Sequence, residues 1–336
     1  MDSRTPTVLL VSGDAALSPS FGYQVSSAFI AQGWHVDTFN YRKLHVHQLP
    51  VARQIMSRLL VKRAQALKPD LVLCLKGNGI AAGTISALRK LGIITANWCL
   101  DEPFGTFGPQ NKVSTISEYD AFFIFDDYYV DLIGRAGARH TVFLPCSSDP
   151  NLVYEEAPLS SRFYTHDASF IGCHYANREK LLDPIADLDI AIWGHRWKKI
   201  NPNSALFPKV QPDTLWADRN FGDLRRMCGL WNSTRCNINI HHPQSLRSGA
   251  NLRFFDLMAS KSFQLCDALP GLNDIAEPLK DTITYSSSAE LSRAIQYFSQ
   301  EQSERHKIVE HAYATFIKRH TTRHRVAQIL SELDLH

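Results

Sequence analysis

A polar loop that enters a short apolar helix carries the side chains best suited to chemistry. Residues 237–267 have the pattern of a buried strand, a glycine-containing loop, an amphipathic helix and a second strand. Asn251, Arg253 and Asp256 lie where the loop meets the helix. Backbone N–H groups at a helix N-terminus carry partial positive charge, so this junction can hold a phosphate while Asp256 reaches sugar hydroxyls. The stretch therefore predicts a nucleotide-sugar pocket.

Each candidate in this region has a functional and a structural interpretation. The guanidinium of Arg253 can bind a diphosphate bidentately, or it can form a helix-surface ion pair with Asp256. Asn251 is a pocket residue, the N-cap of the helix, or both. His241 follows a buried strand and either touches the nucleotide or sugar or is a core histidine. Gly172 allows close backbone approach to the donor or simply ends a strand.

The N-terminal half alternates apolar runs of strand length with segments of helical spacing. The run at 69–75 is nearly all apolar, as expected of a strand that is covered on both faces. This alternation predicts an α/β fold with a parallel, doubly wound sheet. Strands are predicted at 7–12, 34–39, 69–75, 93–98, 121–125 and 141–144, and helices at 21–32, at 50–67 and up to residue 91.

Polar residues follow several of these strands, which is where doubly wound sheets place their sites. Gly13, Lys76 and Asn78 are candidates for an acceptor site or cleft. Asp101 is the candidate general base, with Glu102 as second choice, because a carboxylate at the mouth of a cleft can be desolvated and its pKa raised. The alternative is a loop carboxylate that caps a helix or binds water.

Composition divides the chain of 336 residues into two predicted domains. Residues 1–150 form an N-terminal Rossmann-like domain, and 151–167, rich in Pro, Ser and charge, form a linker. Residues 168–336 form a C-terminal Rossmann-like domain, and its last helical region, at 301–333, is expected to pack back on the N-terminal domain. The irregular stretch at 198–223 is expected to be loop that carries specificity.

Charge and cysteine content narrow the class of protein. A net charge of +3 is too small to make nucleic acid an obligatory partner. The seven cysteines form no C-x-x-C pair and mostly lie in apolar runs, which predicts a reducing, cytoplasmic environment. The start of the chain lacks a signal-peptide pattern, and no run is long enough to insert stably in a membrane. No metal site is predicted, because His320 and His324 lack a further ligand.

The order of motifs in the C-terminal half resembles the CgeB-like spore-maturation glycosyltransferases. The motifs are S-F-I-G, W-G, N-I-H, N-L-R-F-F-D-L-M-A-S and F-Q-L-C-D, spread over most of residues 168–330. The resemblance implies the GT-B architecture, in which an N-terminal acceptor domain and a C-terminal nucleotide-sugar domain face a cleft, and catalysis without a metal. It also implies that Asp256, usually Glu in relatives, holds the ribose. Ser248 stands where those enzymes carry a first Glu.

These patterns predict a glycosyltransferase that moves a sugar from a nucleotide-diphosphate sugar to an acceptor hydroxyl. Asp101 acts on the acceptor, and Lys76 is a further candidate to stabilise the leaving diphosphate. No cofactor beyond the nucleotide sugar is expected. The acceptor stays open between a glycan, a protein, a metabolite and modified DNA. Two alternatives stay open as well: a nucleotide-sugar epimerase of the same fold, and a non-catalytic nucleotide-sugar-binding protein, which Ser248 favours.

Overall fold

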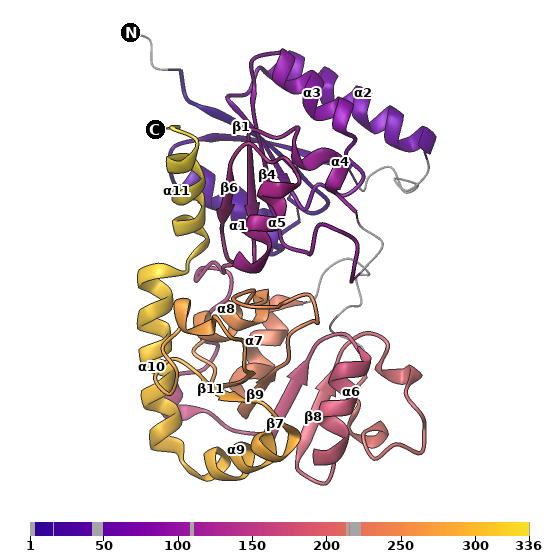
Figure 1. Cartoon of the computed structure of the whole chain (residues 1–336). Helices are drawn as coiled ribbons and strands as arrows, with labels where there is room; N and C mark the ends of the chain where they lie inside the picture. Colours follow the sequence, from indigo (N-terminus) through magenta and orange to yellow (C-terminus); the bar gives the residue numbers. More distant parts are fainter. Residues whose placement is uncertain are drawn as a thin grey trace. The chain divides into compact units, whose positions relative to one another are not determined.

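The chain folds into two compact units, each with a parallel sheet flanked by helices (Figure 1). The computed structural model describes residues 4–15, 17–41, 50–107, 111–212, 215 and 223–335. The first unit comprises Met1–Cys146 and Thr322–His336, and the second comprises Ser147–Thr321. The predicted α/β class with two parallel sheets is confirmed.

The first unit is built on a six-stranded sheet in the order β2-β1-β3-β4-β5-β6, and all neighbouring strands are parallel. Strands β1 and β3 are adjacent although β2 lies between them in the sequence, so the strand order reverses there. Such a reversal is the switch point at which doubly wound sheets bind ligands. The strands are β1 (Thr7–Ser12), β2 (His35–Asn40), β3 (Leu71–Leu75), β4 (Ile94–Cys99), β5 (Ala121–Ile124) and β6 (Thr141–Phe143).

The helices of the first unit include one from the far end of the chain. Helix α11 (Thr322–Glu332) packs on α1 (Phe21–Ile30). Its Arg325 donates through Nε to the carbonyl oxygen of Pro145 at 3.0 Å. These contacts join the C-terminal segment to the first sheet's unit. The remaining helices are α2 (Pro50–Leu67), α3 (Ala82–Lys90), α4 (Val113–Ile116) and α5 (Val130–Arg135).

The second unit contains a five-stranded parallel sheet in the order β11-β10-β9-β7-β8. Its switch point lies between β7 and β9. Strand β9 starts at Thr234, three residues before the predicted start. Its buried Asn237 donates hydrogen bonds to the carbonyl oxygens of Trp231 and Phe263, both at 3.1 Å. The strands are β7 (His166–Ile171), β8 (Ile190–Trp193), β9 (Thr234–Asn239), β10 (Gln264–Asp267) and β11 (Ile283–Tyr285).

The C-terminal helical region differs from its prediction. The single helical region predicted at 301–333 is wrong in one respect, because it is two helices, α10 and α11, that break at His320 and Thr321. His320 Nε2 lies 2.9 Å from the carbonyl oxygen of Ile275, which holds the break in place. The helices are α6 (Ala176–Leu182), α7 (Leu224–Asn232), α8 (Leu252–Ala259), α9 (Ser288–Gln300) and α10 (Gln302–Arg319).

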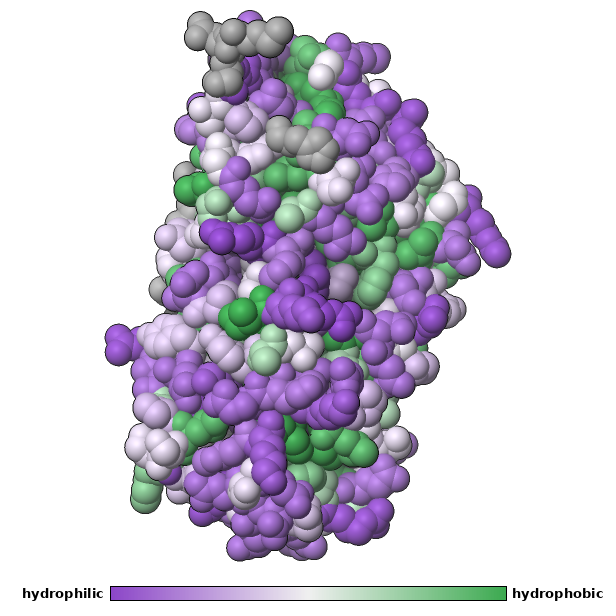
Figure 2. All heavy atoms as spheres, turned by 90° about the vertical axis from the view of Figure 1, so that its left-hand side faces the viewer, coloured by the Kyte–Doolittle hydropathy of each residue, from purple (hydrophilic) through white to green (hydrophobic). Residues whose placement is uncertain are grey.

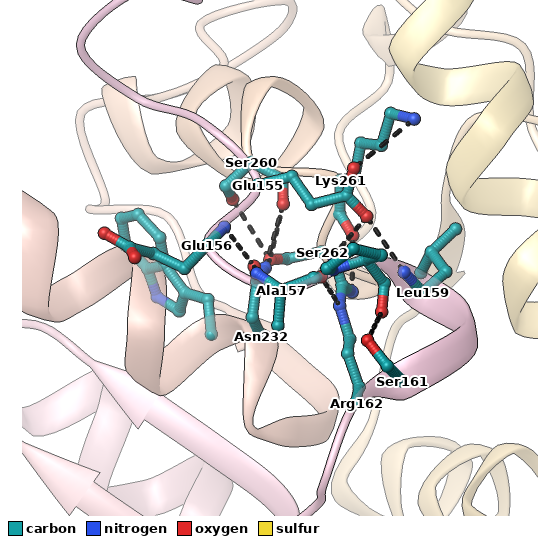
Figure 3. Close-up of polar contacts among 12 residues, drawn as sticks. Glu155, Glu156, Ala157, Leu159, Ser161, Arg162, Asn232, Ser260, Lys261 and Ser262 are labelled. Atoms are coloured by element: carbon teal, nitrogen blue, oxygen red, sulfur yellow. Dashed lines mark hydrogen bonds and ion pairs between the residues drawn. The ribbon is translucent and has the colours of Figure 1, made fainter.

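Asn232, at the end of α7, anchors the segment that leads into the second sheet (Figure 3). Its Oδ1 accepts hydrogen bonds from the backbone N–H groups of Glu156 and Ala157, at 2.7 and 3.2 Å. Its Nδ2 donates to the carbonyl oxygen of Ser260 and to Oγ of Ser262, both at 2.9 Å. One buried amide therefore ties three separate segments together.

The surface over α10 is mostly hydrophilic, with scattered apolar side chains (Figure 2). Most exposed positions of this helix are polar, with Ala314 and Ile317 as apolar exceptions, as expected when only one stripe of a helix packs on a core. Among the described residues, no helix has the length and apolar character needed to cross a membrane.

Candidate functional site

The predicted donor residues gather at the switch point of the second sheet. Gly172 follows β7, and Asn239 ends the adjacent β9. Asn239 Oδ1 accepts hydrogen bonds from Nδ2 of Asn251, at 2.9 Å, and from a guanidinium nitrogen of Arg253, at 3.2 Å. Asn239 was not predicted as a site residue, and it links the end of β9 to the start of α8.

Asn251 is the N-cap of α8. Its Oδ1 accepts from the backbone N–H of Phe254 at 3.0 Å, while its Nδ2 is the donor to Asn239. An Asn at this position satisfies one of the free N–H groups of the first turn. The capping interpretation is therefore correct, and the same side chain also belongs to the polar network at the switch point.

Arg253 points from α8 toward the end of β7. Its guanidinium carbon lies 5.1 Å from the centre of the Phe170 ring, and a Cβ atom at Gly172 would overlap the guanidinium. Glycine at residue 172 therefore leaves room for the guanidinium in this position. Burial, followed by the charge of Arg178, lowers the pKa of Arg253 to about 9.

Asp256 lies one turn after Arg253 on the same helix. Among the described residues no ion pair joins the two side chains; Asp256 Oδ1 instead accepts from Oγ of Ser148 at 2.7 Å. Burial raises the pKa of Asp256 to about 7, against the opposing effects of the Ser148 hydrogen bond and the Arg253 charge. The site thus holds a carboxyl group and a guanidinium whose burial is not fully offset by their partners, so both pKa values are shifted. Shifted pKa values are a common property of ligand-binding groups.

His241 follows β9 and contacts the end of β10. Its Nδ1 lies 2.6 Å from Oδ1 of Asp267, which was not among the predicted residues. His241, Cys266 and Asp267 each bring one potential metal ligand within 4.8 Å of the others. The Nδ1 to Oδ1 distance is that of a hydrogen bond, and burial raises the pKa of Cys266 well above its ordinary value, which favours the thiol.

A pocket of about 460 Å³ opens beside Gly194, between the ends of β7 and β8. Gly194 has φ of +145°, and a Cβ atom there would overlap the backbone of Gly172, so the two strand ends are in direct contact. The cations of Arg196, Lys198 and Lys199 make this pocket suited to an anion. Lys198 and Lys199 belong to the stretch at 198–223 that was expected to carry specificity, whereas Arg196 was not predicted as a site residue. The lining residues are Cys173, Tyr175, Gly194, His195, Arg196, Lys198 and Lys199.

The candidates of the first unit lie at the carboxyl edge of its sheet. Gly13, Lys76 and Asp101 follow β1, β3 and β4, which are neighbours in the sheet. Lys76 Nζ and Asp101 Oδ2 form an ion pair at 2.9 Å, and the charge of Asp101 is the main cause of a raised pKa for Lys76. Asn78 has a buried Oδ1 without a hydrogen-bond partner in the described structure.

Glu102, the second choice for a base, has a structural role. Its buried carboxylate accepts hydrogen bonds from the backbone N–H groups of the loop that follows, at 2.7 Å from Phe104, 3.0 Å from Gly105, 2.9 Å from Thr106 and 3.4 Å from Phe107. Both oxygens of this carboxylate are thus occupied by the loop. Asp101 is the better candidate of the two.

Part of the chain matches a known family, and its fold is that of known structures. Residues 178–331 match the model of a family described as glycosyl transferase-like, and two parallel sheets with flanking helices are the GT-B arrangement of glycosyltransferases. The fold is therefore of the GT-B type, and residues 178–331 are similar to that family. No curated protein matches the chain in sequence.

Solved structures similar to the chain share its fold over nearly the whole length. A glycosyltransferase from Rickettsia africae has a TM-score of 0.67 at 12% identity, covering 98% of each chain. Sucrose-phosphate synthase from Thermosynechococcus elongatus has a TM-score of 0.66 at 11% identity, covering 98% of this chain and 99% of its own. Anabaena HepE in complex with UDP and glucose has a TM-score of 0.65 at 11% identity, with the same coverage.

Proposed function

We propose that the protein transfers a sugar from a nucleotide-diphosphate sugar to an acceptor hydroxyl. The observation that carries the proposal is the placement of Arg253 and Asp256, one turn apart on α8, at the switch point of the second sheet. Asp256 accepts hydrogen bonds from the ribose hydroxyls, and Arg253 binds the diphosphate. Asn251 and Gly172 complete this part of the pocket.

In the proposed reaction, the acceptor oxygen forms a bond to the anomeric carbon of the sugar. The bond from that carbon to the diphosphate oxygen breaks, and the nucleoside diphosphate leaves with the electron pair. Asp101 takes up the hydroxyl proton, which requires its ion pair with Lys76 to open. The charge of Arg253 and the cations of the pocket beside Gly194 stabilise the leaving group, so we propose that no metal is needed.

The order of sequence motifs supports a finer assignment to CgeB-like glycosyltransferases. The matched family segment, residues 178–331, contains most of these motifs. UDP-glucose is a suitable first probe because HepE, with the same fold, was crystallised in complex with UDP-glucose. The acceptor is a glycan, a protein, a metabolite or modified DNA, and each requires its own trial.

A thermal-shift panel of UDP, GDP, dTDP, CDP and ADP tests the donor site. A ligand that binds only the folded state raises the melting temperature by mass action. We expect one diphosphate to stabilise the wild type and Arg226→Ala, an exposed arginine on α7, but not Arg253→Ala or Asp256→Ala. Unchanged binding in both site variants would contradict the assignment.

Turnover separates the transferase from its alternatives. Donor consumption that depends on an acceptor, persists in EDTA and is lost in Asp101→Asn supports the proposal. Conversion of UDP-glucose to an isomer without acceptor indicates an epimerase. Tight binding with neither reaction indicates a nucleotide-sugar-binding protein, as the serine at residue 248 would favour.

A further inference from the structure

The imidazole of His241 is held in one orientation and one tautomer by Asp267. The side chain is 2% exposed. Both oxygens of Asp267 accept the backbone N–H of His241, at 3.0 Å each, and Oδ1 also lies 2.6 Å from Nδ1. Both oxygens of Asp267 therefore act as hydrogen-bond acceptors. In the bond between Nδ1 and Oδ1 the hydrogen then resides on Nδ1 of the ring.

The other ring nitrogen is buried without a partner. Nε2 of His241 has no hydrogen bond among the described residues. A buried polar atom left unpaired costs about 1–3 kcal/mol, so a bound group that pairs with it gains affinity. With its hydrogen on Nδ1, the imidazole presents a lone pair at Nε2, which accepts from a hydroxyl but not from a phosphate oxygen.

The contacts of the site run in one order. Asp256 and Arg253 lie one turn apart on α8, and Arg253 contacts Asn239. Asn239 reaches the Cys266 thiol, at 3.8 Å, and that sulfur lies 4.0 Å from Nδ1 of His241. If Asp256 holds the ribose and Arg253 the diphosphate, His241 lies on the side of the donor's sugar.

We propose that Nε2 of His241 accepts a hydrogen bond from a hydroxyl of the donor's sugar, and that Asp267 is the positioning residue that fixes the tautomer. This inference rests on the proposed function. It assigns His241 to the sugar rather than to the phosphates, and it adds Asp267 to the site.

The affinities for UDP-glucose and UDP, measured by titration calorimetry, test it. His241→Asn keeps an amide N–H near Nδ1 for Asp267 and removes Nε2. Asp267→Asn keeps the ring, but its amide donates to Nδ1 and moves the ring hydrogen to Nε2. We expect each variant to bind UDP-glucose at least about tenfold more weakly while binding UDP as the wild type does. His241→Gln, which places an amide oxygen near Nε2, should recover part of the loss.

Several results would overturn the inference. Equal losses of UDP and UDP-glucose affinity would indicate a structural role, and no loss of either, or equal wild-type affinities for the two ligands, would indicate no contact with the sugar. A requirement for Zn²⁺ or Mn²⁺ that disappears in Asp267→Asn would identify a metal site instead. A wild type that binds neither UDP nor UDP-glucose refutes the UDP-sugar donor on which this inference rests.

Discussion

Replacing Asp256 by Asn should change how the stability of the protein depends on pH. The pKa of this carboxyl group is raised from 3.8 to about 7 in the folded state, with burial as the main cause. Below the lower value the group is protonated in both states, so the folded form suffers no penalty. As pH rises toward 7 the unfolded chain ionises first, and stability falls. The difference between the two pKa values corresponds to a loss of about 4 kcal/mol in the free energy of unfolding, at about 1.4 kcal/mol per pKa unit.

Asparagine cannot ionise, and its carbonyl oxygen can still accept the hydrogen bond from Ser148. The free energy of unfolding of Asp256→Asn, minus that of the wild type, should therefore increase by about 3–4 kcal/mol between pH 4 and pH 7.5. Urea unfolding followed by tryptophan fluorescence measures this difference, since Trp197 and Trp231 are buried in the second unit.

The difference between variant and wild type is the decisive quantity, because other titrating groups contribute equally to both and cancel. Asp187→Asn is the matched control, since Asp187 is an exposed carboxylate of the same unit. A difference for Asp256→Asn that stays constant from pH 4 to pH 7.5 would refute the reasoning, because Asp256 would then ionise equally in the folded and unfolded chain.

Four further substitutions, one of them a control, test the structure by urea unfolding. Gly194→Ala should destabilise the protein strongly, because the added Cβ would overlap the backbone of Gly172. Gly229→Ala is the control: this glycine of α7 has open space around it, so the change should be neutral or stabilising by up to about 1 kcal/mol. Equal effects of the two substitutions would contradict this prediction. Asn232→Ala should cost about 3 kcal/mol, since four hydrogen bonds are lost, and a cost below about 1 kcal/mol would show that water replaces them. Glu102→Gln should cost about 1–3 kcal/mol through the loop that its carboxylate holds, and an unchanged unfolding midpoint would contradict that role.

Most strands could be predicted from the sequence because a strand covered on both faces is a continuous apolar run. Strand β1 agrees with its prediction at both ends, and β3 is buried throughout. Strand β9 was harder because it carries asparagines that are buried through hydrogen bonds to distant carbonyl oxygens. The break between α10 and α11 also depends on a distant partner, the carbonyl of Ile275.

The site was predictable only where its residues have a signal in the local sequence. Asn251 at the loop-to-helix junction has a local signal, since a cap residue is recognised from its immediate neighbours. The partners that set the chemistry of the site have no such local signal. Ser148, which donates to Asp256, lies 108 residues away, and Asp267 lies 26 residues from His241.

The sequence by itself determined the alternation of strands and helices, the class of fold and the polar junction at the start of α8. These depend on local periodicity and on residue preferences within a single turn. Only the tertiary structure decided which carboxylates are engaged. Glu102 is occupied by its own loop, Asp101 by Lys76, and Asp256 is left in a buried setting that raises its pKa. Burial and charge at a side chain are set by segments distant in sequence, so the local pattern carries no record of them.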